Sequence, residues 1–124
     1  MTELDHVALR TTEFEKTEAF FEDIFEMRRY RESGEAPHRI VFYLEGLQLN
    51  EVTELQSGQN VFDHLSIGVE DVAATMRKVG EKYPDCRLEK DHWVVLPDGQ
   101  TRIELKPYHH ALAEYAEYKR RQQA

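Results

Sequence analysis

The chain contains an internal repeat, and this repeat limits its fold more than any other feature. A segment near the start, Leu4-Asp5-His6-Val7-Ala8-Leu9-Arg10, recurs almost position for position as Phe62-Asp63-His64-Leu65-Ser66-Ile67-Gly68. Each copy is followed by a helix-like segment and closes on a strand in which a glutamate, Glu51 or Glu104, stands five residues after a glycine. Two copies are too few for a stacked repeat array, so we predict a pseudo-twofold pair of modules.

Hydrophobic periodicity predicts the same order of elements in both copies. In the first copy, a helix from about Thr12 to residue 26 is favoured by the capping-box spacing of Thr12 and Glu15. In the second, Asp71 is the expected N-cap and Pro84 the expected stop. Apolar positions at helical spacing are Phe14, Phe21, Ile24 and Phe25 in the first helix, and Val72, Met76, Val79 and Tyr83 in the second. The predicted strands are 3–10, 27–31, 39–44, 47–51, 61–69, 86–89, 92–96 and 101–106.

The predicted fold class is α+β, with two βαβββ modules in tandem that form curled mixed sheets. A chain of 124 residues can bury one compact core but not two independent ones, so a single domain over residues 1–124 is expected. Within it, residues 1–57 form the first module and 58–107 the second, joined by a polar linker at 56–60. Residues 108–124 are rich in Ala, Glu and Tyr and are predicted to add a C-terminal helix.

Charge and composition narrow the classes of partner. The formal net charge of -8 argues against nucleic acids and anionic membranes as partners, and favours small molecules or metal cations. The single Cys86 cannot form an internal disulfide, and no apolar run reaches the length of a membrane span. No N-terminal stretch has the pattern of a signal peptide, so a cytoplasmic protein is expected.

The repeated polar residues His6, Glu51, His64 and Glu104 are the candidate functional residues. Alternation along a strand places Glu51 on the same face as Leu47 and Leu49, where an ionised carboxylate needs compensation from Arg10 or from a metal. A lone strand histidine is more often structural than a ligand. Two histidines and two carboxylates at matched places instead indicate a mixed nitrogen and oxygen site suited to Zn, Ni, Co, Fe or Mn.

These segments resemble the vicinal oxygen chelate superfamily, which includes glyoxalase I, methylmalonyl-CoA epimerase, extradiol dioxygenases and bleomycin resistance proteins. The resemblance covers residues 3 to about 107 and rests on the two Asp-His segments and on Leu96-Pro97-Asp98-Gly99-Gln100-Thr101-Arg102-Ile103-Glu104-Leu105, which is similar to the family's closing motif. It implies paired modules that half enclose a divalent metal. The four implied ligands are His6, Glu51, His64 and Glu104.

Within this superfamily the ligand set is most similar to bacterial glyoxalase I, which has two His and two Glu. The resemblance implies a metal-dependent lyase or isomerase that acts on vicinal oxygens through an enediolate, with Ni, Zn or Co as the expected metal and Fe or Mn as alternatives. Glu104 is then the first candidate for the catalytic base and Glu51 the second, while Arg10 is similar to an arginine that contacts substrate.

Three alternatives stay open. An extradiol dioxygenase would use Fe(II) with two His and one Glu. An epimerase would place Gln where Glu51 stands, and a non-catalytic binding module would lack the metal. We also expect a homodimer, because family members pair their modules within one chain or between two.

Overall fold

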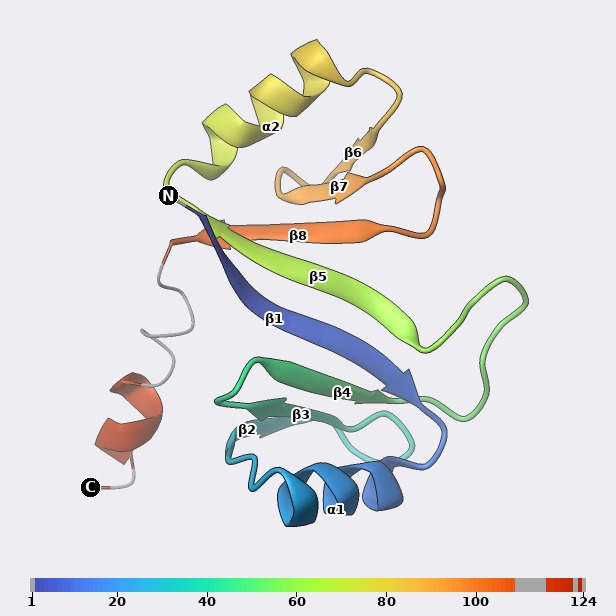
Figure 1. Cartoon of the computed structure of the whole chain (residues 1–124), viewed down its shortest axis with the longest axis vertical. Helices are drawn as coiled ribbons and strands as arrows, with labels where there is room; N and C mark the ends of the chain where they lie inside the picture. Colours follow the sequence, from blue (N-terminus) through green and yellow to red (C-terminus); the bar gives the residue numbers. More distant parts are fainter. Residues whose placement is uncertain (1, 109–115, 122, 124) are drawn as a thin grey trace.

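The computed structural model describes residues 2–108, 116–121 and 123. Two βαβββ modules follow each other in the chain, as the periodicity predicted (Figure 1). The first consists of β1 (Thr2–Thr11), α1 (Phe14–Ile24), β2 (Arg29–Ser33), β3 (Ile40–Tyr43) and β4 (Leu47–Glu51). The second consists of β5 (Phe62–Val69), α2 (Val72–Lys82), β6 (Arg87–Glu89), β7 (Trp93–Val95) and β8 (Arg102–Pro107).

One eight-stranded mixed sheet unites the two modules, in the order β2-β3-β4-β1-β5-β8-β7-β6. The central strands β1 and β5 are antiparallel to each other, and each has its own module's last strand as a parallel neighbour on its outer side. Figure 1 shows β1 and β5 side by side at the centre, with α1 and α2 at opposite ends of the sheet. A shift of 58 residues carries His6 onto His64 and the bounds of α1, 14 and 24, onto those of α2, 72 and 82.

The two helices begin differently. Asp71 caps α2 as predicted, because its side chain accepts a hydrogen bond of 2.9 Å from the backbone N–H of Ala74. The predicted Thr12 capping box does not form. The N-cap of α1 is Glu13, which makes no side-chain capping bond.

Apolar side chains form a separate cluster between each helix and the sheet, where the sequence had predicted a single core. The first cluster contains Phe14, Val41, Tyr43 and Leu49, and the second contains Val69, Val94 and Leu105. Both clusters pack against one continuous sheet, which joins the two cores. The predicted apolar stripe on α1 is only partly buried, because Ile24 and Phe25 remain 59% and 57% exposed.

The C-terminal segment is helical over residues 116–121, where the ring of Tyr118 lies 6.5 Å from that of Tyr30. Residues 109–115 of the predicted C-terminal helix fall outside the described residues. Among the described residues, no helix combines the length and apolar character needed to cross a bilayer.

Candidate metal centre

The two central strands bring His6 and His64 together. The antiparallel register of β1 and β5 sets Ser66 opposite His6 and Ala8 opposite His64, so the two histidines are diagonal neighbours. Ala8 and Ser66 are both fully buried, and their small side chains leave space between the imidazoles. The Nε2 atoms of the two rings lie 3.2 Å apart.

Each imidazole is oriented by the aspartate that precedes it. The Nδ1 atom of His6 lies 2.8 Å from Asp5 Oδ2, and that of His64 lies 3.1 Å from Asp63 Oδ1. Burial raises the pKa of Asp63, but its hydrogen bond with His64 and the charge of Arg10 outweigh this and hold the pKa below its usual range. An ionised carboxylate only accepts, so each Nδ1 carries the proton and donates.

This tautomer leaves a lone pair on both Nε2 atoms, which face each other at 3.2 Å. Two lone pairs at this distance repel unless a cation or a proton lies between them. The pair of Asp-His units therefore orients both imidazoles as ligands for a single positive charge.

Glu104 completes the cluster from β8. It lies beside Ser66 in the parallel register of β5 and β8, and its Oε1 atom is 4.0 Å from His6 Nε2 and 3.8 Å from His64 Nε2. Its other oxygen, Oε2, lies 3.9 Å from His92 Nε2 and 3.8 Å from Lys106 Nζ. One carboxylate oxygen thus faces the imidazoles and the other faces two basic groups.

The geometry of this cluster fits a metal ion. Two donor atoms bound to one ion at about 2.1 Å each lie at most about 4.2 Å apart, and all three pairs of donor atoms in the cluster satisfy this limit. The hydroxyl oxygen of Ser66 is buried and has no hydrogen-bond partner among the described residues, which leaves it available to a ligand of the site. His6, His64 and Glu104 belong to one chain, so a second chain is not needed to assemble them.

Gln48 occupies the position in the first module that Glu104 occupies in the second. Ala8 and Ser66 are equivalent in the two central strands, and they pair with Gln48 and Glu104 respectively in the parallel registers. Gln48 also lines the cavity in front of the cluster. The internal symmetry therefore makes Gln48, and not Glu51, the counterpart of Glu104.

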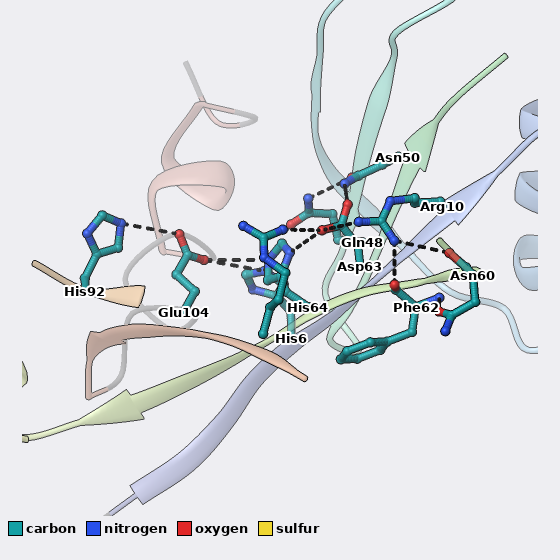
Figure 2. Close-up of polar contacts among 11 residues, drawn as sticks. His6, Arg10, Gln48, Asn50, Asn60, Phe62, Asp63, His64, His92 and Glu104 are labelled. Carbon is teal, nitrogen blue, oxygen red and sulfur yellow. Dashed lines mark hydrogen bonds and ion pairs between the residues drawn. The ribbon is translucent and has the colours of Figure 1, made fainter. Parts of the chain in front are cut away.

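A chain of hydrogen bonds joins Gln48 to His64 (Figure 2). Asn50 Nδ2 donates to Asp63 Oδ2 over 3.0 Å, and Gln48 Nε2 donates to Asn50 Oδ1 over 2.8 Å. Because the Asp63 carboxylate can only accept, it fixes the amide orientation of Asn50 and, through it, that of Gln48. The carbonyl oxygen of Gln48 is the atom left to accept or to bind a cation.

Glu51 does not join the cluster. It lies on the face of β4 that carries Leu49, which packs in the core beneath α1. Both of its carboxylate oxygens accept hydrogen bonds from the guanidinium of Arg39, each over 2.8 Å. These hydrogen bonds lower the pKa of Glu51 to about 2, so the compensation that its charge requires comes from an ion pair.

Arg10 also lies apart from the cavity. Its Nη1 donates to the backbone oxygens of Phe62 and Asn60, over 2.6 Å and 3.1 Å, and its Nη2 lies 3.6 Å from Asp63 Oδ1. These contacts fasten the end of the linker to β1 and support the aspartate behind His64. Arg10 is not among the residues that line the cavity in front of the cluster.

The cavity in front of the cluster has a volume of about 210 Å³. Its cationic side chains are those of Arg31 and Lys106, from β2 and β8. The Arg31 guanidinium lies over the ring of Phe42, 4.7 Å from its centre. The full lining is His6, Tyr30, Arg31, Phe42, Gln48, His64, Glu104 and Lys106.

Four polar residues of the site were not among the predicted site residues, although the sequence contained signals for them: Asp5, Asp63, Gln48 and Asn50. The aspartates before both histidines were repeated with them, which is typical of an orienting partner. Gln48 and Asn50 are two residues apart on one face of a strand, opposite the face of Leu47, Leu49 and Glu51. His92 Nε2 lies 3.9 Å from Glu104 Oε2, whereas His109 and His110 lie outside the described residues.

No family model and no curated protein matches the chain by sequence. Solved structures do match it. Methylmalonyl-CoA epimerase from Mycobacterium tuberculosis shares 18% of residues at a TM-score of 0.66, over 89% of this chain and 90% of that one. A Streptomyces coelicolor methylmalonyl-CoA epimerase variant in complex with 2-nitronate-propionyl-CoA shares 17% at a TM-score of 0.64, over 87% and 96%.

A halotolerant catechol dioxygenase matches with 13% identity and a TM-score of 0.60, over 82% of this chain and 39% of its own. The matched parts of these epimerase and dioxygenase structures share the overall fold of this chain. The TM-scores establish the fold, and identities of 13–18% leave the activity to the chemistry of the site. The chain has the fold of the vicinal oxygen chelate superfamily.

Proposed function

We propose that the protein is a divalent-metal-dependent enzyme that moves a proton next to a carbonyl group of a small substrate. The observation that carries this proposal is the pair of Nε2 atoms 3.2 Å apart, with an aspartate oxygen beside the Nδ1 atom of each ring. His6, His64 and Glu104 would hold the metal, and the carbonyl oxygen of Gln48 is the proposed fourth ligand.

A bound divalent cation would polarise two adjacent substrate oxygens and so acidify a neighbouring C–H bond. The protein's own contribution is the base. Glu104 Oε2 faces away from the imidazoles, and we assign it the removal and return of the proton. Lys106 Nζ lies 3.8 Å from this oxygen.

The cavity favours a small anionic substrate. Arg31 and Lys106 bring two positive charges to its wall in a chain whose net charge is -8. We therefore assign substrate binding to these two residues and not to Arg10.

Two versions of the reaction differ in the product. Glyoxalase-like isomerisation was suggested by two His and two Glu ligands, and it weakens once Gln48 takes the place of Glu51. A glutamine at this position is instead what the resemblance implies for an epimerase, and epimerases are among the matching structures. We favour epimerase-type proton exchange of an acyl thioester or a related 2-oxo compound.

An extradiol dioxygenase is the second candidate. Two His and one carboxylate are the ligands of a non-haem iron oxygenase, and without Glu51 the site has this composition. This version predicts Fe(II) and oxygen consumption, and the catechol dioxygenase match supports it.

Proton exchange with solvent separates the two candidates. The metal-loaded protein would be incubated in D₂O with methylmalonyl-CoA or with a 2-oxoaldehyde thiol adduct, and deuterium at the acidified carbon would be followed by proton NMR. Exchange that is lost in Glu104→Gln supports the proposal, because the variant keeps the shape of the side chain and removes the base. Absence of exchange together with oxygen consumption on a catechol would replace it with the dioxygenase.

A further inference from the structure

The second module has a large apolar cavity on the face of the sheet opposite the metal centre. It has a volume of about 550 Å³ and lies between α2 and strands β5, β8 and β7. Ile103 and Leu105 line it, and they flank Glu104 on β8. Because side chains alternate along a strand, these two face away from the metal centre while Glu104 faces toward it.

The internal repeat shows how the side chains around this cavity differ from those at the same places in the first module. The shift of 58 residues sets Val72 and Val79 of α2 at the positions of Phe14 and Phe21 in α1. In the strands, Phe42 pairs with Gln48 as Trp93 pairs with Glu104. The residue that follows Trp93, Val94, therefore corresponds to Tyr43.

Three aromatic side chains that fill the first core are thus valines in the second. Phe14 and Tyr43 are 6% and 2% exposed, and Phe21 packs against them. At one further position Gly80 takes the place of Glu22, which accepts the hydroxyl hydrogen bond of Tyr43. Val79 and Val94, two of these three valines, line the cavity, where their side chains are smaller than the aromatic ones of the first module.

The cavity has an apolar floor and a polar mouth. Val69, Val94 and Leu105 form the floor and are each at most 6% exposed. Lys82, Tyr83, Pro84 and Asp85 stand at the mouth, where the end of α2 meets solvent. A volume of about 550 Å³ lies within the range of ligand sites, roughly 300–1,000 Å³, and an apolar cavity is a poor site for water.

We infer that this cavity is a second binding site, for a small hydrocarbon-rich molecule whose apolar body contacts the floor and whose polar end stays at the mouth. A volume of about 550 Å³ over a floor of valine and leucine side chains suits a small molecule. The class we propose is a medium-length acyl chain or alcohol. This site is independent of the proposed metal chemistry.

The test uses 1-decanol with the full-length protein carrying ¹³C-labelled methyl groups. We expect saturable binding with intermolecular NOEs to the methyls of Val69, Ile103 and Leu105. The double variant Val79→Phe/Val94→Phe puts aromatic rings where the first module has Phe21 and Tyr43. It is expected to weaken binding at least tenfold and to raise the Tm. The matched control Lys78→Phe adds the same ring at an exposed position of α2 and leaves binding unchanged.

The NOE measurement on the unsubstituted protein keeps the test decisive if the double variant does not fold. Absence of saturable binding, or NOEs confined to other methyls, would overturn the inference. It would also be overturned if sedimentation showed a dimer and intermolecular NOEs placed the second copy against the same methyls. Decanol binding that persists in His64→Ala would show that the site stands apart from the metal centre.

Discussion

Gln48 and Glu104 occupy equivalent positions in the two modules, each beside a fully buried small residue of a central strand. Glu51, three residues farther along β4, is instead hydrogen-bonded to Arg39. This relationship decides which side chains can share a metal with His6 and His64, and it makes the ligand set testable.

Metal content should distinguish Glu51 from the residues of the cluster. We expect Glu51→Gln to keep stoichiometric divalent metal, and His64→Ala and Glu104→Ala to lose most of it, because only the last two remove donor atoms of the cluster. Elemental analysis of the purified variants measures this directly. Full metal occupancy in a variant that lacks both His6 and His64 would refute the site.

Asn50 should affect metal binding without contacting the metal. Asn50→Leu breaks the hydrogen bonds that orient Gln48 and Asp63, and loss of such an orienting partner typically costs about 10- to 100-fold in affinity. Co²⁺ titration followed by its visible absorption would report both the affinity and the ligand geometry. Gln100→Leu, a surface amide that bonds Gly58, is the control and should leave both unchanged.

The ion pair of Glu51 with Arg39 should make folding stability depend on pH. Hydrogen bonds from Arg39 lower the pKa of Glu51 from 4.5 to about 2 in the folded protein. The stabilisation is therefore complete above about pH 4.5 and disappears as the pH falls toward 2. Urea unfolding at several pH values should show Glu51→Gln less stable than the unsubstituted protein at pH 6, with a difference that narrows below pH 4.5. A constant difference would contradict the assignment.

The first core should depend strongly on Phe14. This side chain is 6% exposed and packs with Val41, Tyr43 and Leu49, so Phe14→Ala is expected to lower the free energy of unfolding by about 3–5 kcal/mol. Phe20 lies in the same helix but is 53% exposed, and Phe20→Ala should cost clearly less. Chemical denaturation of both variants makes the comparison, and equal losses would show that the core is placed wrongly.

Arg31 should act on substrate binding more than on turnover. If its charge holds an anionic substrate group in the cavity, Arg31→Gln raises KM while kcat changes little, because the base and the metal ligands remain. Steady-state kinetics on the substrate found by deuterium exchange gives both constants. Arg87→Gln removes an exposed arginine of β6 and serves as the control; an equal rise in KM there would point to a general charge effect.

The sequence by itself determined the paired modules, the element order and the three residues that the structure brings together in the cluster. The repeat of Asp-His gave His6 and His64, and the closing motif gave Glu104, because these patterns lie within single strands whose alternation is readable. The same alternation already placed Glu51 on the face of Leu47 and Leu49. That face is covered by α1, which the sequence pattern alone did not reveal.

Only the tertiary structure showed that Gln48, and not Glu51, is the counterpart of Glu104, and which charged side chains pair with one another. The count of five residues from each glycine to its glutamate does not align the last strands of the two modules. Gly46 directly precedes β4, whereas Gly99 stands three residues before β8. The register is fixed by hydrogen bonds to the central strands, and a different turn length shifts the count without shifting the register. The fastening of Arg10 to Phe62 and the cavity behind α2 likewise depend on contacts between segments far apart in the chain.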